Sequence, residues 1–202
     1  MYINIYFEGG GDSAETKAKL RRGMDAFLGE LKNKAREKRW HWKLVACGGR
    51  QEAYDAFMNA RSKNKDALNI LLVDSEAPVV SSPAEHLKTR QGDGWDLRGV
   101  PDEHLHLMAQ AMEAWIVADP DALAAYYGRG FKANVLPQRQ NLEDEPKLDV
   151  AEKLSAATRG TQKGEYQKIR HASELLERVS PDRAKARCSR CKRLFEKLGE
   201  LI

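Results

Sequence analysis

The spacing of hydrophobic residues changes several times along the first third of the chain. Runs of β-forming residues at 2–8 (YINIYFE), 41–47 (HWKLVAC) and 68–73 (LNILLV) predict three strands. Between them, apolar residues recur at helical spacing and predict two amphipathic helices, marked by Leu20, Met24, Phe27, Leu28, Leu31 and Ala35 and by Ala53, Ala56, Phe57 and Ala60. Strands that alternate with helices across short connections predict an α/β fold with a mostly parallel sheet.

Two local signals refine this picture. Asp12 and Glu15 have the spacing of a capping box, which predicts the start of the first helix. The run 68–73 is almost uninterrupted in its apolar character, as expected of a central parallel strand that is buried on both faces.

The middle of the chain is less regular. Residues 77–103 contain several prolines and glycines and predict a loop region with one short helix. The segment 104–108 (HLHLM) predicts a fourth strand, and 109–118 (AQAMEAWIVA) predicts a helix that Pro120 ends or kinks.

From about residue 140 onward the pattern is polar and helical. A length of 202 residues suits one domain, or one domain with an appendage. We therefore expect an α/β domain over residues 1–140 and a helical C-terminal extension over 141–202 that packs on it.

Composition places the chain among ordinary globular proteins. No apolar run reaches 18 residues and no signal peptide is evident, so we expect no membrane span. Three cysteines (Cys47, Cys188 and Cys191) give an odd number without a disulfide framework, which favours a reducing cytoplasm. Cys188 and Cys191 lack the second pair that a structural zinc site needs, so we expect them to be packing residues.

Charge is divided unevenly along the chain. Residues 1–50 carry 11 Lys and Arg against 6 Asp and Glu, residues 51–150 carry 10 against 17, and residues 151–202 carry 13 against 7. An acidic middle between basic ends suits a site that holds cations while its rim attracts a polyanion. The alternative is that lysine and arginine simply solvate helix surfaces.

Four acidic residues occupy the most apolar stretches of the chain. Glu8 ends the first predicted strand and precedes the glycine turn GGGD. Asp74 and Glu76 directly follow the third strand, and positions i and i+2 of an extended chain point to the same side. Glu113 lies on the inward face of the helix predicted at 109–118.

Their placement favours a metal site. In open α/β sheets, ligands bind beyond the carboxyl ends of the strands, where Glu8, Asp74 and Glu76 should emerge. Buried carboxylates need a cation or a proton, and an all-oxygen cluster suits Mg²⁺ or Mn²⁺ rather than zinc. The glycine turn has neither the G-x-G-x-x-G spacing nor a Walker lysine, so it does not predict a direct nucleotide cradle. The alternative is structural ion pairing with Arg21, Arg22, Arg50 or Lys43.

The same residues carry a resemblance to known families. A strand that ends in Glu before a glycine turn, followed by a strand that ends in Asp-x-acid, resembles the Toprim domain of topoisomerases, primases and OLD-type nucleases. Toprim proteins usually carry Asp-x-Asp, whereas this chain has Asp74-Ser75-Glu76. Over nearly its full length the chain resembles the bacterial and archaeal domain-of-unknown-function family 4276, through the segments FEGGGD, LRRG, ACGGR, LLVDSE, LHLMAQAMEAWIVADPDAL and YQKIRHASELLE.

The resemblance implies metal-dependent phosphodiester hydrolysis on DNA or RNA. Glu8 and Asp74 would be primary ligands of Mg²⁺ or Mn²⁺, and Glu76 and Glu113 would be further ligands or would orient water. Two such metals activate the nucleophile and stabilise the leaving oxygen. The resemblance also implies an ABC-type ATPase as partner in phage defence, and a homodimer is a further possibility.

Three basic residues complete the hypothesis. Lys168 would stabilise the negative charge that develops on a scissile phosphate. His171, three residues further on, would contact phosphate, although a solvated helix surface explains both residues equally well. Arg50 would bind phosphate or pair with Asp74. The competing hypothesis for the whole protein is a non-catalytic Toprim-like scaffold that regulates an ATPase.

Overall fold

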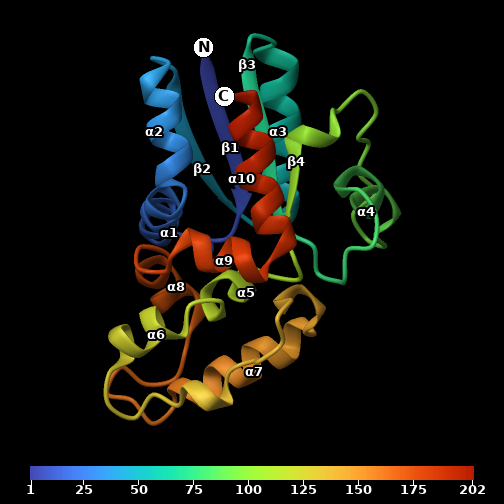
Figure 1. Ribbon diagram of the computed structural model, residues 1–202. Helices are drawn as coiled ribbons and strands as arrows, with labels where there is room; N and C mark the ends of the chain where they lie inside the picture. Colours follow the sequence, from blue (N-terminus) through green and yellow to red (C-terminus); the bar gives the residue numbers. More distant parts are fainter.

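The computed structural model covers residues 1–202 and shows an α/β architecture with helices on both faces of one open sheet (Figure 1). The sheet has four parallel strands in the order β2-β1-β3-β4. They are β1 (Tyr2–Glu8), β2 (His41–Gly48), β3 (Ala67–Asp74) and β4 (Leu105–Met108). The predicted α/β fold with its parallel sheet is therefore confirmed.

Ten α-helices connect and cover the strands. Those interleaved with the strands are α1 (Ala14–Phe27), α2 (Gly29–Glu37), α3 (Arg50–Lys63) and α4 (Pro83–Thr89). Those after β4 are α5 (Glu113–Val117), α6 (Pro120–Tyr127), α7 (Lys147–Thr158), α8 (Lys168–Leu176), α9 (Pro181–Arg187) and α10 (Ser189–Leu201). No strand follows β4, so residues 141–202 are helices and loops. None of these helices combines the length and the apolar character needed to cross a membrane.

The apolar run of β3 is buried on both sides of the sheet, as its sequence predicts. Ile70 and Leu72 belong to the core formed with α1, α2 and the C-terminal helices. Leu71 and Val73 belong to a second core, which contains residues of α3 and α4. Successive strand residues point to opposite faces, so two of these side chains pack against the helices on one face of the sheet and two against the helices on the other.

The strand order creates a topological switch point between β1 and β3. From β1 the chain crosses to β2 on one side and later returns to β3 on the other side of β1. The connections consequently leave the sheet on opposite faces, which opens a crevice at the carboxyl ends of the two strands. Glu8 is the last residue of β1 and Asp74 is the last residue of β3.

The first predicted helix differs from expectation in its start and in its continuity. Ser13, rather than Asp12, is the N-cap, and its hydroxyl accepts the backbone N–H of Thr16 at 3.1 Å. The helix is also interrupted at Leu28, which separates α1 from α2. Gly29 follows this break, and glycine is a poor helix former. Both helices nevertheless keep the buried face that the sequence predicts.

The helix predicted at 109–118 is shorter than expected. Only Glu113–Val117 forms α5, preceded by a turn. Pro120 begins α6 rather than kinking α5, because proline is well accommodated at a first helical position. Asp119 caps α6 by accepting the backbone N–H of Ala122 at 3.1 Å.

The C-terminal helices share a core with the sheet domain. α8 packs against α1, and α10 packs against β4 and α2. Phe195 of α10 meets Phe27 of α1 edge to face, with ring centroids 5.9 Å apart. α8 approaches α1 so closely at Gly23 that a Cβ there would lie 2.3 Å from the carbonyl oxygen of Ser173. This packing brings Lys168, the first residue of α8, to the carboxyl edge of the sheet.

Candidate metal centre

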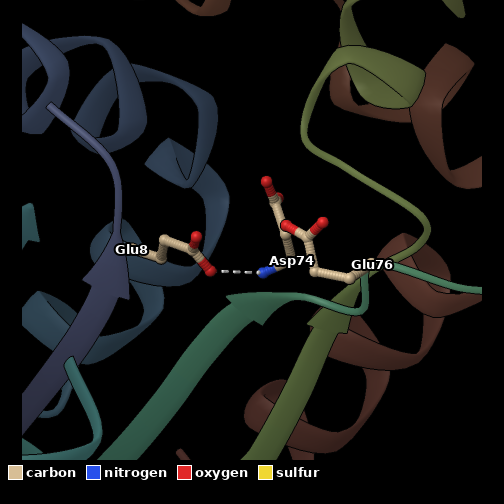
Figure 2. Close-up of side chains that lie close together, drawn as sticks. All are labelled: Glu8, Asp74 and Glu76. Atoms are coloured by element: carbon tan, nitrogen blue, oxygen red, sulfur yellow. Dashed lines mark hydrogen bonds between the residues drawn. The ribbon is translucent and has the colours of Figure 1, made fainter. Parts of the chain in front are cut away.

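Three carboxylates meet at the switch point of the sheet. One carboxylate oxygen from each of Glu8, Asp74 and Glu76 lies within 4.8 Å of the other two. Figure 2 shows Glu8 and Glu76 reaching toward each other from opposite sides of Asp74. The expectation that these three residues emerge at one edge is confirmed by this geometry.

The backbone places Glu76 by a turn rather than by an extended strand. Glu76 has a positive φ of 64°, so the chain does not remain extended at this residue. Its N–H donates to the carbonyl oxygen of Gln110 at 2.9 Å, and the N–H of Ser75 donates to that of Met108 at 3.0 Å. These bonds hold the turn after β3 against the chain that follows β4, and the turn still directs Glu76 toward Asp74.

Asp74 is the most buried member of the cluster. Its side-chain Oδ1 accepts the backbone N–H of Met112 at 2.9 Å, and its Oδ2 lies 3.1 Å from the ammonium of Lys168. Burial raises the pKa of Asp74, and the ammonium of Lys168 opposes that rise. A buried carboxylate held in this way depends on nearby positive charge.

Lys168 joins Asp74 to Glu113. Its Nζ lies 3.3 Å from Glu113 Oε2, and Glu113 Oε1 accepts the phenol O–H of Tyr166 at 3.1 Å. Burial lowers the pKa of Lys168, but Asp74 and Glu113 together raise it above its ordinary value, so the ammonium stays charged. Glu113 thus lies beside the cluster and is not one of the three convergent carboxylates.

Arg50 is held in place by residues that sequence reasoning missed. Its guanidinium pairs with Asp93 at 2.7 Å and lies over the ring of Trp95, 4.7 Å from the centroid. It also donates to the backbone carbonyl of Asp74 and lies 3.6 Å from Glu8 Oε2. Arg50 therefore faces the acidic edge as expected, but its strongest ion pair is with Asp93 rather than with Asp74.

Burial and a neighbouring carboxylate both disfavour the ionised form of Glu8. Burial and then repulsion from Asp74 raise the pKa of Glu8 to about 7, although Arg50 acts in the opposite direction. At neutral pH, both the protonated and the ionised form of a carboxyl group with such a pKa are substantially populated. An additional cation near Glu8 would favour the ionised form.

Lys147 is a further site residue that the sequence did not reveal. Its ammonium lies 2.5 Å from Glu76 Oε1 and 3.9 Å from Asp74 Oδ2. It is the first residue of α7, in a polar helical segment that gives no signal distinguishing it from other lysines. Only the folded arrangement brings this charge to the cluster.

His171 does not lie at the acidic edge. The side chain is buried, and its Nδ1 is 3.2 Å from the hydroxyl of Tyr127 and accepts the backbone N–H of Gln167 at 3.2 Å. Burial lowers the pKa of His171, which favours the neutral ring. The expectation that His171 contacts phosphate is corrected: α8 turns Lys168 toward the site and His171 into the core.

The cluster suits a hard divalent cation in its donor chemistry. All three convergent groups offer oxygen, and Glu8 Oε1 and Glu76 Oε2 accept no hydrogen bond from the protein. The ion pairs around the cluster form two separate sets: Asp74, Glu76 and Glu113 with Lys147 and Lys168, and Glu8 and Asp93 with Arg50 and Arg90. Taken together, the two sets have one more acid than bases. The residues therefore fit Mg²⁺ or Mn²⁺, with Lys147 as the nearest competitor for Glu76.

A cavity of about 260 Å³ opens beside Glu8. The glycine turn Gly9–Gly11 forms one wall, and Thr16 and Lys168 also line it. All three glycines of the turn have positive φ, and a Cβ at Gly10 would lie 2.9 Å from the backbone of Lys17. The glycines are therefore needed for the turn itself, and the turn leaves space next to the carboxylates.

Fold and site together define an α/β protein with a carboxylate cluster at the topological switch point of a parallel sheet. The chain belongs to the family described as "Domain of unknown function (DUF4276)", whose family model matches residues 7–199. The resemblance to family 4276 seen in the sequence is thereby confirmed. Neither the curated proteins nor the solved structures include a significant match to this chain.

Proposed function

We propose that this protein is a Mg²⁺- or Mn²⁺-dependent nuclease of Toprim-like type that hydrolyses phosphodiester bonds in DNA or RNA. The observation that carries the proposal is the convergence of Glu8, Asp74 and Glu76 within 4.8 Å at the switch point. The charged ammonium of Lys168 beside them and the adjoining cavity add support.

Each residue has a defined part in this proposal. Glu8, Asp74 and Glu76 would hold the cation, which when bound supplies Lewis-acid activation of water and of the phosphate. Lys168 would place positive charge near the phosphate oxygens, where negative charge increases during hydrolysis. Glu113 keeps the Lys168 ammonium in position through its 3.3 Å contact.

A cleavage assay tests the proposal. Labelled single- and double-stranded DNA and RNA are incubated with the protein in MgCl₂, in MnCl₂ and in EDTA. We expect cleavage that needs the divalent ion and is lost in Glu8→Gln. Glu15→Gln is the matched control, because Glu15 is an exposed glutamate in the first turn of α1. Absence of cleavage on all four substrates, or cleavage that persists in EDTA or in Glu8→Gln, would contradict the proposal.

A second candidate is a non-catalytic scaffold that regulates an ABC-type ATPase. The observation that favours it is that Lys147 and Lys168 already pair with Asp74 and Glu76. On this hypothesis the carboxylates serve only as structural ion-pair partners and bind no divalent ion. Isothermal titration calorimetry with MnCl₂ separates the two candidates, since the scaffold predicts no binding heat that depends on Glu8.

A further inference from the structure

A groove lined mainly by cationic side chains lies away from the acidic cluster. It has a volume of about 550 Å³ and is bordered by α1, α2 and β2. Figure 1 shows these three elements (blue) together at one side of the molecule. Of the nine residues lining the groove, five are Lys or Arg and one is acidic; the cations are Arg21, Arg22, Lys32, Arg36 and Lys43.

Three of these cations have no acidic partner. Lys32 pairs with Asp25 and Arg22 pairs with Glu177. Arg21, Arg36 and Lys43 are exposed and form no ion pair. Their charges therefore add to one another across the groove instead of being neutralised locally.

The surrounding sequence strengthens this positive field. Residues 17–43 contain 10 Lys and Arg against 3 Asp and Glu, a net charge of +7, whereas the whole chain carries only +4. Five of these ten cations line the groove itself. Solvation of helix surfaces accounts for scattered lysines but not for three unpaired cations that line one groove.

The groove also contains an aromatic side chain held in its wall. Trp42 is half-buried, and its Nε1–H donates to Asp25 Oδ1 at 3.1 Å. An indole beside a row of cations suits nucleic acid, in which phosphates meet lysine and arginine and bases stack on aromatic rings. An acidic protein segment would use the cations but would have no general need of the indole.

Strand β2 connects the groove to the candidate metal centre. β2 runs from Trp42 in the groove to Gly48, which pairs with Glu8. Leu44 and Gly48 are four residues apart, or about 13 Å along a strand. Lys17, one helical turn before Arg21 on α1, lies beside Gly48 and also forms no ion pair. Cations therefore lead from the groove to the glycine turn next to Glu8.

We propose that the α1–α2–β2 groove binds the sugar–phosphate backbone of nucleic acid through Arg21, Arg36 and Lys43, and directs the strand toward the carboxylates. The inference rests on the proposed function for the identity of the substrate. It assigns binding to residues that are separate from the cleavage chemistry, so binding and cleavage can fail independently.

The test is fluorescence anisotropy with labelled 20-nucleotide single-stranded DNA and RNA and with the corresponding duplexes, all in EDTA. The Arg21→Gln/Arg36→Gln/Lys43→Gln variant should bind at least about tenfold more weakly at moderate salt than wild type. The slope of log K against log salt should fall in magnitude by about 2 for a single strand, because three phosphate contacts are lost. All three side chains are exposed, so the variant should melt within a few degrees of wild type.

The matched control removes the same charge elsewhere. Lys63→Gln/Lys65→Gln/Arg129→Gln neutralises three exposed cations outside the groove and should bind like wild type. Equal affinity of the groove and control variants, or no binding by wild type at low salt, would overturn the inference. Polyglutamate and unlabelled oligonucleotide are also compared as competitors that displace the labelled oligonucleotide. If polyglutamate displaces it at the same concentration of negative charge as the oligonucleotide does, the inference is overturned in favour of an acidic protein partner. Groove-dependent binding without any cleavage would support the inference while removing the proposed nuclease activity.

Discussion

The carboxylate of Glu8 accepts a hydrogen bond from the backbone N–H of Asp74, with 3.2 Å between Oε2 and N. The bond joins the ends of two neighbouring strands at the switch point and fixes the carboxylate of one beside that of the other (Figure 2). Its donor is neutral, so it orients Glu8 without supplying a counter-charge. The cluster is thus rigidly assembled yet short of positive charge, and a divalent cation would relieve that repulsion.

Divalent-ion binding should raise thermal stability. A cation that binds only the folded protein adds about 2.7 kcal/mol at a hundredfold excess over its Kd. For a chain of this size that corresponds to a melting shift of several degrees. Differential scanning fluorimetry with and without millimolar MgCl₂ or MnCl₂ measures the shift.

Two variants decide whether the shift comes from the cluster. Asp74→Asn should abolish it, and Glu8→Gln should both abolish it and raise the melting temperature in EDTA, since repulsion with Asp74 is removed. Glu15→Gln should keep the wild-type shift because Glu15 is exposed and is not one of the three convergent carboxylates. A melting temperature of wild type that is indifferent to both ions would favour structural ion pairing.

Lys147→Gln should tighten metal binding. The Lys147 ammonium lies 2.5 Å from Glu76 and competes with any cation at that carboxylate. Removing one such charge changes the interaction by about 1 kcal/mol or more, which corresponds to at least about fivefold in Kd for Mn²⁺. Calorimetric titration with MnCl₂ measures this change.

Lys153→Gln provides the control for Lys147. Lys153 lies on the same helix and pairs with Glu145 at 3.0 Å, away from the three convergent carboxylates. Its variant should keep the wild-type Kd. Weaker Mn²⁺ binding in Lys147→Gln than in Lys153→Gln would mean that Lys147 supports the site rather than competing for it.

Much of the fold and part of the site follow from sequence patterns. The strand ending at Asp74 is recognisable because its apolar run is continuous, and Glu8 stands out because strand ends of a parallel sheet share one edge. Local pattern therefore locates the acids on β1 and β3. It cannot set their final distances, which depend on the strand order and on the left-handed turn at Glu76.

The charged residues around the carboxylates could be predicted only in part: the sequence indicates Lys168 and Arg50 but not Lys147 or Asp93. Lys147 and Asp93 come from polar segments in which many charged residues alternate, and only tertiary packing selects them. Lys168 and His171 are three residues apart on one helix, yet one faces the carboxylates and the other the core. Their difference is set by how α8 packs on α1, and sequence periodicity in so polar a segment did not resolve it.

Gly23→Ala should disturb the contact that positions α8. The new Cβ would lie 2.3 Å from the carbonyl oxygen of Ser173, so the two helices must separate. Overpacking of this kind costs about 1–3 kcal/mol, and the melting temperature should fall by several degrees. Gly29→Ala is the control, because nothing lies within 4 Å of its Cβ position and alanine favours helix. Equal melting temperatures for the two variants would contradict the close packing of α1 and α8.

The neutral ring of His106 should make stability depend on pH. Nε2–H donates to the carbonyl oxygen of Glu103 at 3.0 Å, and Nδ1 lies 3.3 Å from the guanidinium of Arg193, from which it accepts. Asp102, which pairs with Arg193 at 2.6 Å, and His104 are the other titratable groups nearby. Burial and then Arg193 lower the pKa of His106 from its ordinary 6.5 to about 3.

Between these two pKa values the unfolded chain binds a proton at His106 that the folded protein does not. The contribution of His106 to stability is therefore complete above pH 6.5, declines as the pH falls, and is fully lost near pH 3. From pH 7 to pH 5 the free energy of unfolding should decrease by about 2 kcal/mol on account of this residue.

Urea unfolding at both pH values, in wild type and in His106→Gln, measures the difference. The variant should lose that part of the pH dependence, whereas His41→Gln, at an exposed position, should retain it. Identical pH dependence in wild type and His106→Gln would show that folding does not lower the pKa of His106, contrary to its burial and to its contact with Arg193.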